Sequence, residues 1–548
     1  MKKFFVFLRQ LFPPIQRAPA KNVANIGENV QIGQFAQGSN ILQFQIGAFV
    51  FPVRTLLALV AVAAIAALGV WWLVTPGQMS QGGSAANVAI VEFGARDAQS
   101  RVTHSAQGAY LADWLYNRLK FELADLPETT RPQFWHLATS FDLSHLFEKR
   151  LTAPIQNEQD SERVAQQVGA SIVIYGDLVE GTSVEAFVPQ LYVAQKKGEA
   201  DELTGSQQLG QPIPLPNPIN DEYLATYLQP LGRALVWFSR GLQQDLNGRY
   251  DLAYQIFQQG EQNLADWDEQ QGKEVLYYFI GREALFLANC ESDAQIVFKP
   301  QANVSGVERA LNEAEKNFAR ARQIAERDGR VYARATLGLG QVAFQRAQRQ
   351  LIPPEATTAG QCRINVSPMG APRPCPPRTP PNMDAAALNQ AREYISQAIT
   401  LFDRARAELP QPAPARLDAK FSAARATADT LLGTVELLQQ NPAVAETLAR
   451  NASATLQTLT QTTPADDRRT RANVYLALGS AYALAGSARH AQNDAPNAIP
   501  QFENAASAYN ACVNMIPADD PDAFLRALLL PNCFCARADT QKILDGLR

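Results

Sequence analysis

The stretch YLALGSAY, residues 475–482, carries apolar and small residues at the spacing of one helix face. A second helix is predicted to follow, with Ala498, Phe502 and Ala505 on one face. Gly479 and the alanines allow two helices to approach closely, and the large aromatic residues are predicted to fill the space around them. Such a helix pair cannot cover its own apolar face, so neighbouring pairs are predicted to stack into a solenoid.

The spacing aromatic-x-x-Leu-Gly-x-x-Tyr, followed by Ala-x-x-x-Phe-x-x-Ala, resembles the tetratricopeptide repeat. Units with similar internal offsets recur from residue 221 to residue 548, about five or six in all, with a Pro-rich insertion at 351–382. The residues that the resemblance assigns to helix packing are Trp237, Gly241, Gly248, Tyr250, Ala253, Phe257, Tyr277, Gly281, Ala314, Phe318, Ala321, Gly340, Ala391, Ala398, Gly433, Tyr475, Leu478, Gly479, Tyr482, Ala498, Phe502 and Ala505.

The same resemblance implies a concave groove that binds a protein or peptide partner. Its specificity is expected from polar side chains on the first helix of each repeat. The candidate groove residues are Arg233, Arg240, Gln244, Arg282, Tyr332, Gln341 and Gln345.

Composition and motifs favour binding over catalysis. The chain has 548 residues, 19% of them charged, and a net charge of -4, so it lacks the basic balance of a nucleic-acid-binding protein. Gly338 and Gly340 match a dinucleotide-binding pattern formally, but the pattern needs a preceding strand, and we interpret them as helix-packing glycines. The four histidines are widely spaced along the sequence. We therefore predict no catalytic residues, no cofactor and no metal.

Residues 55–74, TLLALVAVAAIAALGVWWLV, contain no charged residue. A helix of this length would cross the hydrocarbon core of a bilayer. The preceding segment is rich in Lys and Arg, so the positive-inside rule predicts a cytoplasmic N-terminus. The predicted location is a bacterial inner membrane, crossed once, with the C-terminal domains extracytoplasmic.

Residues 1–54 form the predicted cytoplasmic segment. Within it, residues 23–48 alternate apolar residues with Gly and Asn, which favours short strands and tight turns. Because so short a stretch makes no core alone, pairing of several copies into a homo-oligomer is a hypothesis.

Residues 87–200 have a different pattern, predicting a small mixed α/β domain of order β-α-β-α-β-β, between linkers at 75–86 and 201–220. VAIVEF at 88–93 and VGASIVIYG at 168–176 are similar to segments of the N-terminal domain of TolB and of the related CsgG and FlgO folds. That resemblance implies assembly and contact within the cell envelope, without catalysis.

All six cysteines lie within the repeat region. Cys362 and Cys375 bracket part of the Pro-rich insertion and form one candidate disulfide; Cys512 with Cys533 or Cys535 is another. Free or buried thiols are the alternative.

The sequence thus predicts a multidomain α plus α/β protein: an N-terminal segment, one transmembrane helix, a small α/β domain and an all-α solenoid. The preferred function is a membrane-anchored scaffold that binds protein or peptide partners. One alternative is a sensor or signalling subunit that couples partner binding to the N-terminal segment, and another is an enzyme whose site the motifs do not reveal.

Overall fold

The structure is a computed structural model. It describes residues 43–46, 49–52, 87–124, 133–138, 149–150, 154–180, 185–194, 205–216, 221–246, 249–264, 267, 272–288, 294, 296–298, 304–325, 327, 329–351, 384–411, 413, 415–465, 467–517, 525 and 529–548. The chain divides into two units, residues 1–72 and 73–548. In the first unit, strands β1 (Gln43–Ile46) and β2 (Phe49–Pro52) pair antiparallel, and β1 falls within the stretch predicted to form strands.

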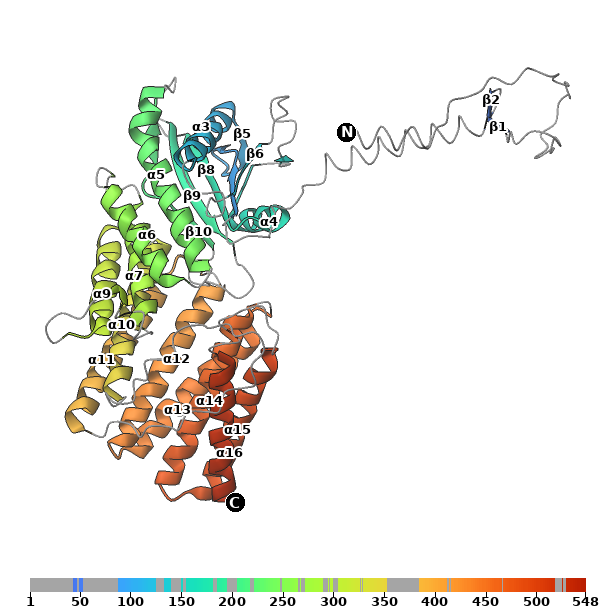
Figure 1. Ribbon diagram of the computed structural model, residues 1–548. Coiled ribbons are helices and arrows are strands. Elements are labelled where there is room, and N and C mark those ends of the chain that lie inside the picture. Colours follow the sequence, from blue (N-terminus) through green and yellow to red (C-terminus); the bar gives the residue numbers. More distant parts are fainter. Residues whose placement is uncertain are drawn as a thin grey trace. The chain divides into compact units, whose positions relative to one another are not determined.

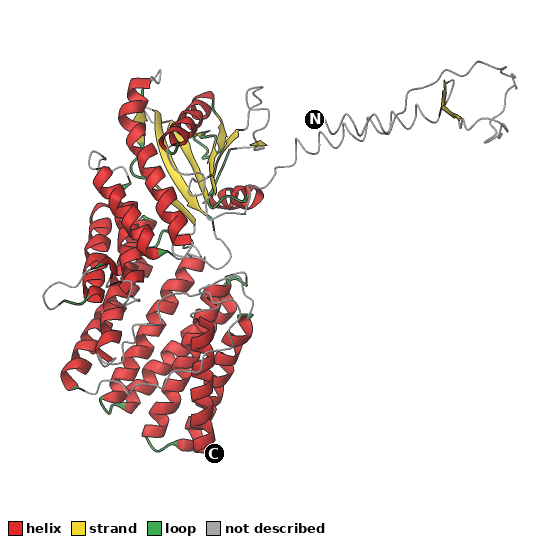
Figure 2. Cartoon of the chain, in the orientation of Figure 1, coloured by secondary structure: helices red, strands yellow, loops and turns green. Residues whose placement is uncertain are grey.

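The second unit begins with a mixed sheet, shown in yellow in Figure 2. Its strand order is β10-β9-β8-β3-β6-β7. The central strand β3 (Asn87–Val91) is buried along its whole length and runs parallel to β6 (Gln133–Ala138) and β8 (Ile172–Glu180). β8 forms an antiparallel hairpin with β9 (Glu185–Val193). The predicted order of the main elements is confirmed, with short strands β4 (Gly94–Arg96), β5 (Val102–His104) and β7 (Lys149–Arg150) added.

Two helices connect these strands. Helix α3 (Ala106–Glu122) buries Leu111, Leu115 and Leu119, which recur every fourth residue and so share one face. Its N-cap, Ser105, accepts a hydrogen bond from the Gly108 amide at 3.3 Å. Helix α4 (Glu158–Val168) ends at Gly169, whose φ of 71° suits a residue without a side chain.

The α/β layer extends beyond its predicted end. Strands β10 (Gly205–Gln208) and β11 (Ile213–Leu215) both pair with β9, within residues that the sequence indicates as a linker. Pro214 is compatible with β11 because β9 is the strand it pairs with among those described, so the proline lies in an edge strand.

The rest of the described chain is a helical array (Figure 1). Helices follow one another in five pairs along the described residues, with a closing helix α16 (Leu530–Leu547). The pairs are α5 (Asp221–Leu246) with α6 (Tyr250–Asn263), α7 (Lys273–Ala288) with α9 (Gly306–Ile324), α10 (Arg330–Leu351) with α11 (Ala385–Ala407), α12 (Ala415–Leu438) with α13 (Pro442–Thr462), and α14 (Arg468–Ala491) with α15 (Ala495–Met515). Each matches a unit predicted from the sequence.

Within several pairs, a glycine on the first helix faces a large side chain of the second. A Cβ at Gly241 would lie 2.3 Å from Phe257, and one at Gly340 would lie 2.5 Å from Phe402. Phe318 fits against both Gly281 and Gly338. Gly338 and Gly340 therefore are packing glycines within α10, as the sequence indicates.

One predicted partner differs. The large side chain against Gly479 belongs to Tyr509, whereas Phe502 lies against Gly486, two helical turns further along α14. The remaining assigned positions are buried or half-buried, except Gly248, which lies outside the described residues. Gly433 is buried and lies against Leu484 of α14. The half-buried ones are Trp237, Tyr250, Tyr475 and Tyr482.

The first helices of neighbouring pairs lie closer together than the second helices do. α10 contacts α7, α12 contacts both α10 and α14, and α14 contacts α16. Each second helix packs instead between its own partner and the next first helix. From α7 onward, this arrangement gives the array one face lined by first helices.

The α/β layer shares a core with the part of the array from α5 to α10. Buried side chains from Val88 through Leu235 to Val342 belong to one hydrophobic cluster. A bidentate ion pair adds to it: Arg330 on α10 donates to both carboxylate oxygens of Glu158 on α4, at 2.9 and 2.5 Å. The layer is thus packed onto the helices rather than joined by a free linker.

The predicted fold class and location require correction. Across the residues that the structure describes, no helix is long and apolar enough to cross a membrane. Even α7, in which every residue but Phe286 is buried, has only 16 residues and includes Lys273, Glu274, Arg282 and Glu283. The fold that the structure supports is an α/β layer with a helical array. The predicted inner-membrane location depended on the transmembrane helix and is therefore not supported either. Residues 55–74 themselves lie outside the described residues.

One predicted disulfide alternative is present. Cys512 of α15 is bonded to Cys533 of α16, with their Cα atoms 6.0 Å apart, and so ties the closing helix to the last pair. Cys362 and Cys375 lie outside the described residues.

Candidate functional site

The predicted groove residues do not form one surface. Arg282 is 4% exposed and forms ion pairs of 2.6 Å with both Asp245 and Glu283, so this prediction was wrong: its charge is used inside the array. Arg233, Arg240, Gln244, Gln341 and Gln345 are half-buried. Arg240 lies over the Trp237 ring, and burial lowers the pKa of its guanidinium. Of the seven, Tyr332 lines a cavity.

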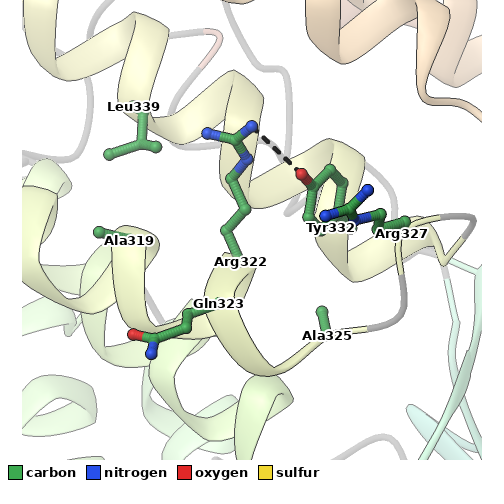
Figure 3. Close-up of a pocket in the computed structure, with 7 residues that line it drawn as sticks. All are labelled: Ala319, Arg322, Gln323, Ala325, Arg327, Tyr332 and Leu339. Carbon is green, nitrogen blue, oxygen red and sulfur yellow. Dashed lines mark hydrogen bonds between the residues drawn. The ribbon is translucent and has the colours of Figure 1, made fainter.

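That cavity lies where α9 ends and α10 begins, and has a volume of about 360 Å³. Figure 3 shows the residues that line it: Ala319, Arg322, Gln323, Ala325, Arg327, Tyr332 and Leu339. Arg322 and Tyr332 point toward one another from the two helices, joined by a hydrogen bond (Figure 3). We call this cavity the α9–α10 pocket.

Hydrogen bonds fix the polar wall of the α9–α10 pocket. The Tyr332 hydroxyl accepts from Arg322 at 3.2 Å and from Arg404, on α11, at 3.3 Å. Arg404 also donates to Glu408 at 2.6 Å, and the Thr336 hydroxyl donates to the same carboxylate at 2.8 Å. Three helices therefore hold the Tyr332 side chain in place.

Sequence reasoning missed most of this group. Arg322 lies in the last turn of a second helix, where a basic residue is ordinarily explained by the helix dipole. Arg404 is 72 residues from Tyr332 and separated from it by the Pro-rich insertion, so no local spacing links them. The sequence shows only that α9 and α11 each have arginine in the last turn, and this does not link either residue to Tyr332.

A second polar cluster lies just after β3, where β4 pairs with β5 and β8. There the half-exposed His104 contacts the buried Glu92, and Arg96 donates to the buried Asp177 at 3.0 Å. Burial raises the pKa of Asp177 even though Arg96 acts to lower it. The carboxyl edge of an α/β sheet commonly holds ligands. Each acid here is already engaged by a base on a neighbouring strand, which is the pattern of a structural pair.

A second described histidine of the α/β layer also lies beside an acidic residue. His136, on β6, is buried, with its Nδ1 atom 3.2 Å from the Asp113 carboxylate on α3. Within the described ranges, no group of three or more His, Cys, Asp or Glu residues is placed to hold a metal ion.

A wider hollow of about 530 Å³ lies between α3 and α5. Its rim carries Tyr110 and Phe121, which are 44% and 72% exposed, and Arg118 lies over the Phe121 ring. This hollow combines aromatic surface with charges of both signs. Its lining therefore does not favour one chemical class of ligand, whereas that of the α9–α10 pocket does.

No known protein family and no curated protein sequence matches this chain. The site is therefore interpreted from its own geometry.

Proposed function

We propose that the helical array is a binding scaffold for polypeptide partners. The observation that supports this most is the contact between successive first helices from α7 to α14, which gives that part of the array a face formed by first helices. Stacked helix pairs with this arrangement offer extended binding surfaces, since each pair adds side chains to the same face.

We also propose that the pairs are repeats of the tetratricopeptide type. Their support is a shared internal offset: Phe257 follows Gly241, and Phe502 follows Gly486, by the same number of residues, and both phenylalanines fill the space above their glycine. The α/β layer would then position the array and provide further contacts, with binding rather than catalysis as the role of the protein.

A matched pair of variants tests the scaffold. Gln341, on first helix α10, is a predicted groove residue, and Gln397 is exposed on second helix α11. A photo-crosslinking amino acid at position 341 of the full chain should capture a defined polypeptide partner, and one at position 397 should not. Once that partner is identified, Gln341→Lys should weaken its binding while Gln397→Lys leaves it unchanged. Equal behaviour of the two positions would refute the assignment of the binding face to the first helices.

A further inference from the structure

The Tyr332 hydroxyl, at the α9–α10 pocket, donates no hydrogen bond within the described part of the chain. Its two hydrogen-bond partners among the described residues are the guanidinium groups of Arg322 and Arg404. A guanidinium has only donors, so both bonds occupy the oxygen and neither takes the phenolic proton. Because Tyr332 lines the cavity, that proton is available to an acceptor that enters it.

Arg322 contributes a second unused donor. Its Nε atom is buried and has no hydrogen-bond partner in the described part of the chain. A buried N–H without an acceptor costs free energy, and an incoming oxygen atom would recover that cost. The Arg322 guanidinium also lies over the Tyr332 ring, 5.0 Å from its centroid, which fixes its plane beside the cavity.

The charges of the pocket favour an anion. Arg322 and Arg327 line the pocket, and Arg404 adds a third positive charge behind it through its bond to Tyr332. Among the described residues, Glu408 is the carboxylate paired with Arg322 and Arg404. Glu408 is 2.6 Å from Arg404 but 3.9 Å from Arg322, so it mainly neutralises Arg404. Arg327 is exposed at the cavity rim.

The remaining lining is mostly apolar. Leu339, Ala319 and Ala325 line the cavity together with Gln323. A ligand that fits both walls has a short aliphatic stem and a terminal oxyanion, as the side chain of Glu or Asp does. A volume of about 360 Å³ admits such side chains but not a folded domain.

We propose that the α9–α10 pocket binds a carboxylate side chain of an acidic peptide segment. Arg322 and Tyr332 donate to the carboxylate, and Arg327 closes the rim. That the ligand is a peptide rests on the proposed scaffold function; the preference for a carboxylate rests on the pocket alone.

Fluorescence polarisation with the full chain tests this proposal. The probes are fluorescein-labelled hexaglutamate and, as the uncharged control, labelled hexaglutamine. Hexaglutamate should bind, hexaglutamine should not, and raised salt should weaken the binding because the contacts are ionic. Tyr332→Phe removes only the hydroxyl and should weaken hexaglutamate about tenfold, as expected for a hydrogen bond to a charged group.

Two further variants separate the pocket from general electrostatics. Arg322→Lys keeps the charge but loses the Nε donor, and should also weaken binding about tenfold. Lys316→Gln removes an exposed charge from the same helix and should change the affinity by less than about twofold. Unchanged affinity in Tyr332→Phe, or an equal loss in Lys316→Gln, would overturn the proposal. Since partner capture at Gln341 uses no acidic probe, it can succeed when this experiment fails, and the two failures are distinguishable.

Discussion

Replacing Gly241 with alanine tests the helix-pair packing at a position where the added Cβ atom would lie too close to a neighbouring ring. The added Cβ would lie 2.3, 2.4 and 2.7 Å from three ring atoms of Phe257. That ring cannot withdraw freely, because it is fully buried and its centroid lies 5.2 Å from that of Phe279. Overpacking of this kind costs about 1–3 kcal/mol, and alanine's higher helix propensity returns about 1 kcal/mol. At the upper end, the net cost is about 2 kcal/mol.

Hydrogen exchange measured by mass spectrometry on the full chain is the appropriate assay, because it reports local opening without assuming two-state unfolding. A cost of about 2 kcal/mol should accelerate exchange in peptides from α5 and α6 by about 30-fold, at roughly 1.4 kcal/mol for each factor of ten. Gly232→Ala, on the same helix, is the control. Its new Cβ would meet Leu115 and Arg118 at 3.6 and 3.7 Å, which is ordinary contact. That variant should exchange at the wild-type rate or more slowly.

The reasoning fails if Gly241→Ala is as protected as Gly232→Ala. A double variant sharpens the result: Phe257→Leu should cost less in the Gly241→Ala background than alone, because the smaller side chain relieves the new contact. Additive effects of the two substitutions would show that they do not meet.

Three other changes have clear expected outcomes. Gly546→Ala, in α16, adds a Cβ with nothing within 4 Å and should raise stability by about 0.5–1 kcal/mol, seen as slower exchange in that helix; faster exchange would contradict its placement. Cys512→Ser should lower the stability of the α15–α16 segment by about 3 kcal/mol, because its bond to Cys533 closes a loop in the unfolded chain; limited proteolysis should release α16, and reductant should reproduce the effect in wild type but add nothing in the variant. For Glu158, burial raises the pKa, but the hydrogen bond and charge of Arg330 outweigh it, so the net pKa lies below 4.5. Its stabilisation, about 1 kcal/mol for a pair exposed by about a third, is therefore complete above that pH and lost as pH falls through the lowered pKa. Thermal unfolding of wild type and Glu158→Gln should differ at pH 7 and converge toward pH 3, and parallel curves would contradict the pairing.

The helix pairs could be predicted from sequence because small and aromatic residues at helical spacing mark each contact locally. The side chain that packs against each glycine could not be predicted in this way. Gly479 and Gly486 are two helical turns apart and so share one face of α14, and periodicity alone does not distinguish which of them Phe502 meets.

Long-range pairing explains the other differences. Arg282 reads as a surface charge, yet Asp245 from the preceding helix pair lies 2.6 Å away and allows its burial. Strands β10 and β11 have turn-forming residues and little apolar pattern, and they become strands because β9 offers them an unpaired edge. The α9–α10 pocket depends on residues from three helices, so its cationic character emerges only after folding.

The first turn of α10 contacts both the α/β layer and the helices that form the α9–α10 pocket. Arg330 begins the helix and is held by Glu158 of the α/β layer. Two residues later, Tyr332 is held by an arginine from α9 and another from α11. The α/β layer thus fixes the start of the helix that carries the pocket hydroxyl, and the neighbouring helices fix the side chain itself. A side chain immobilised before a ligand arrives loses less conformational entropy on binding. The shared core of the layer and the array therefore bears directly on recognition, since it keeps the donors of the pocket in position without a ligand.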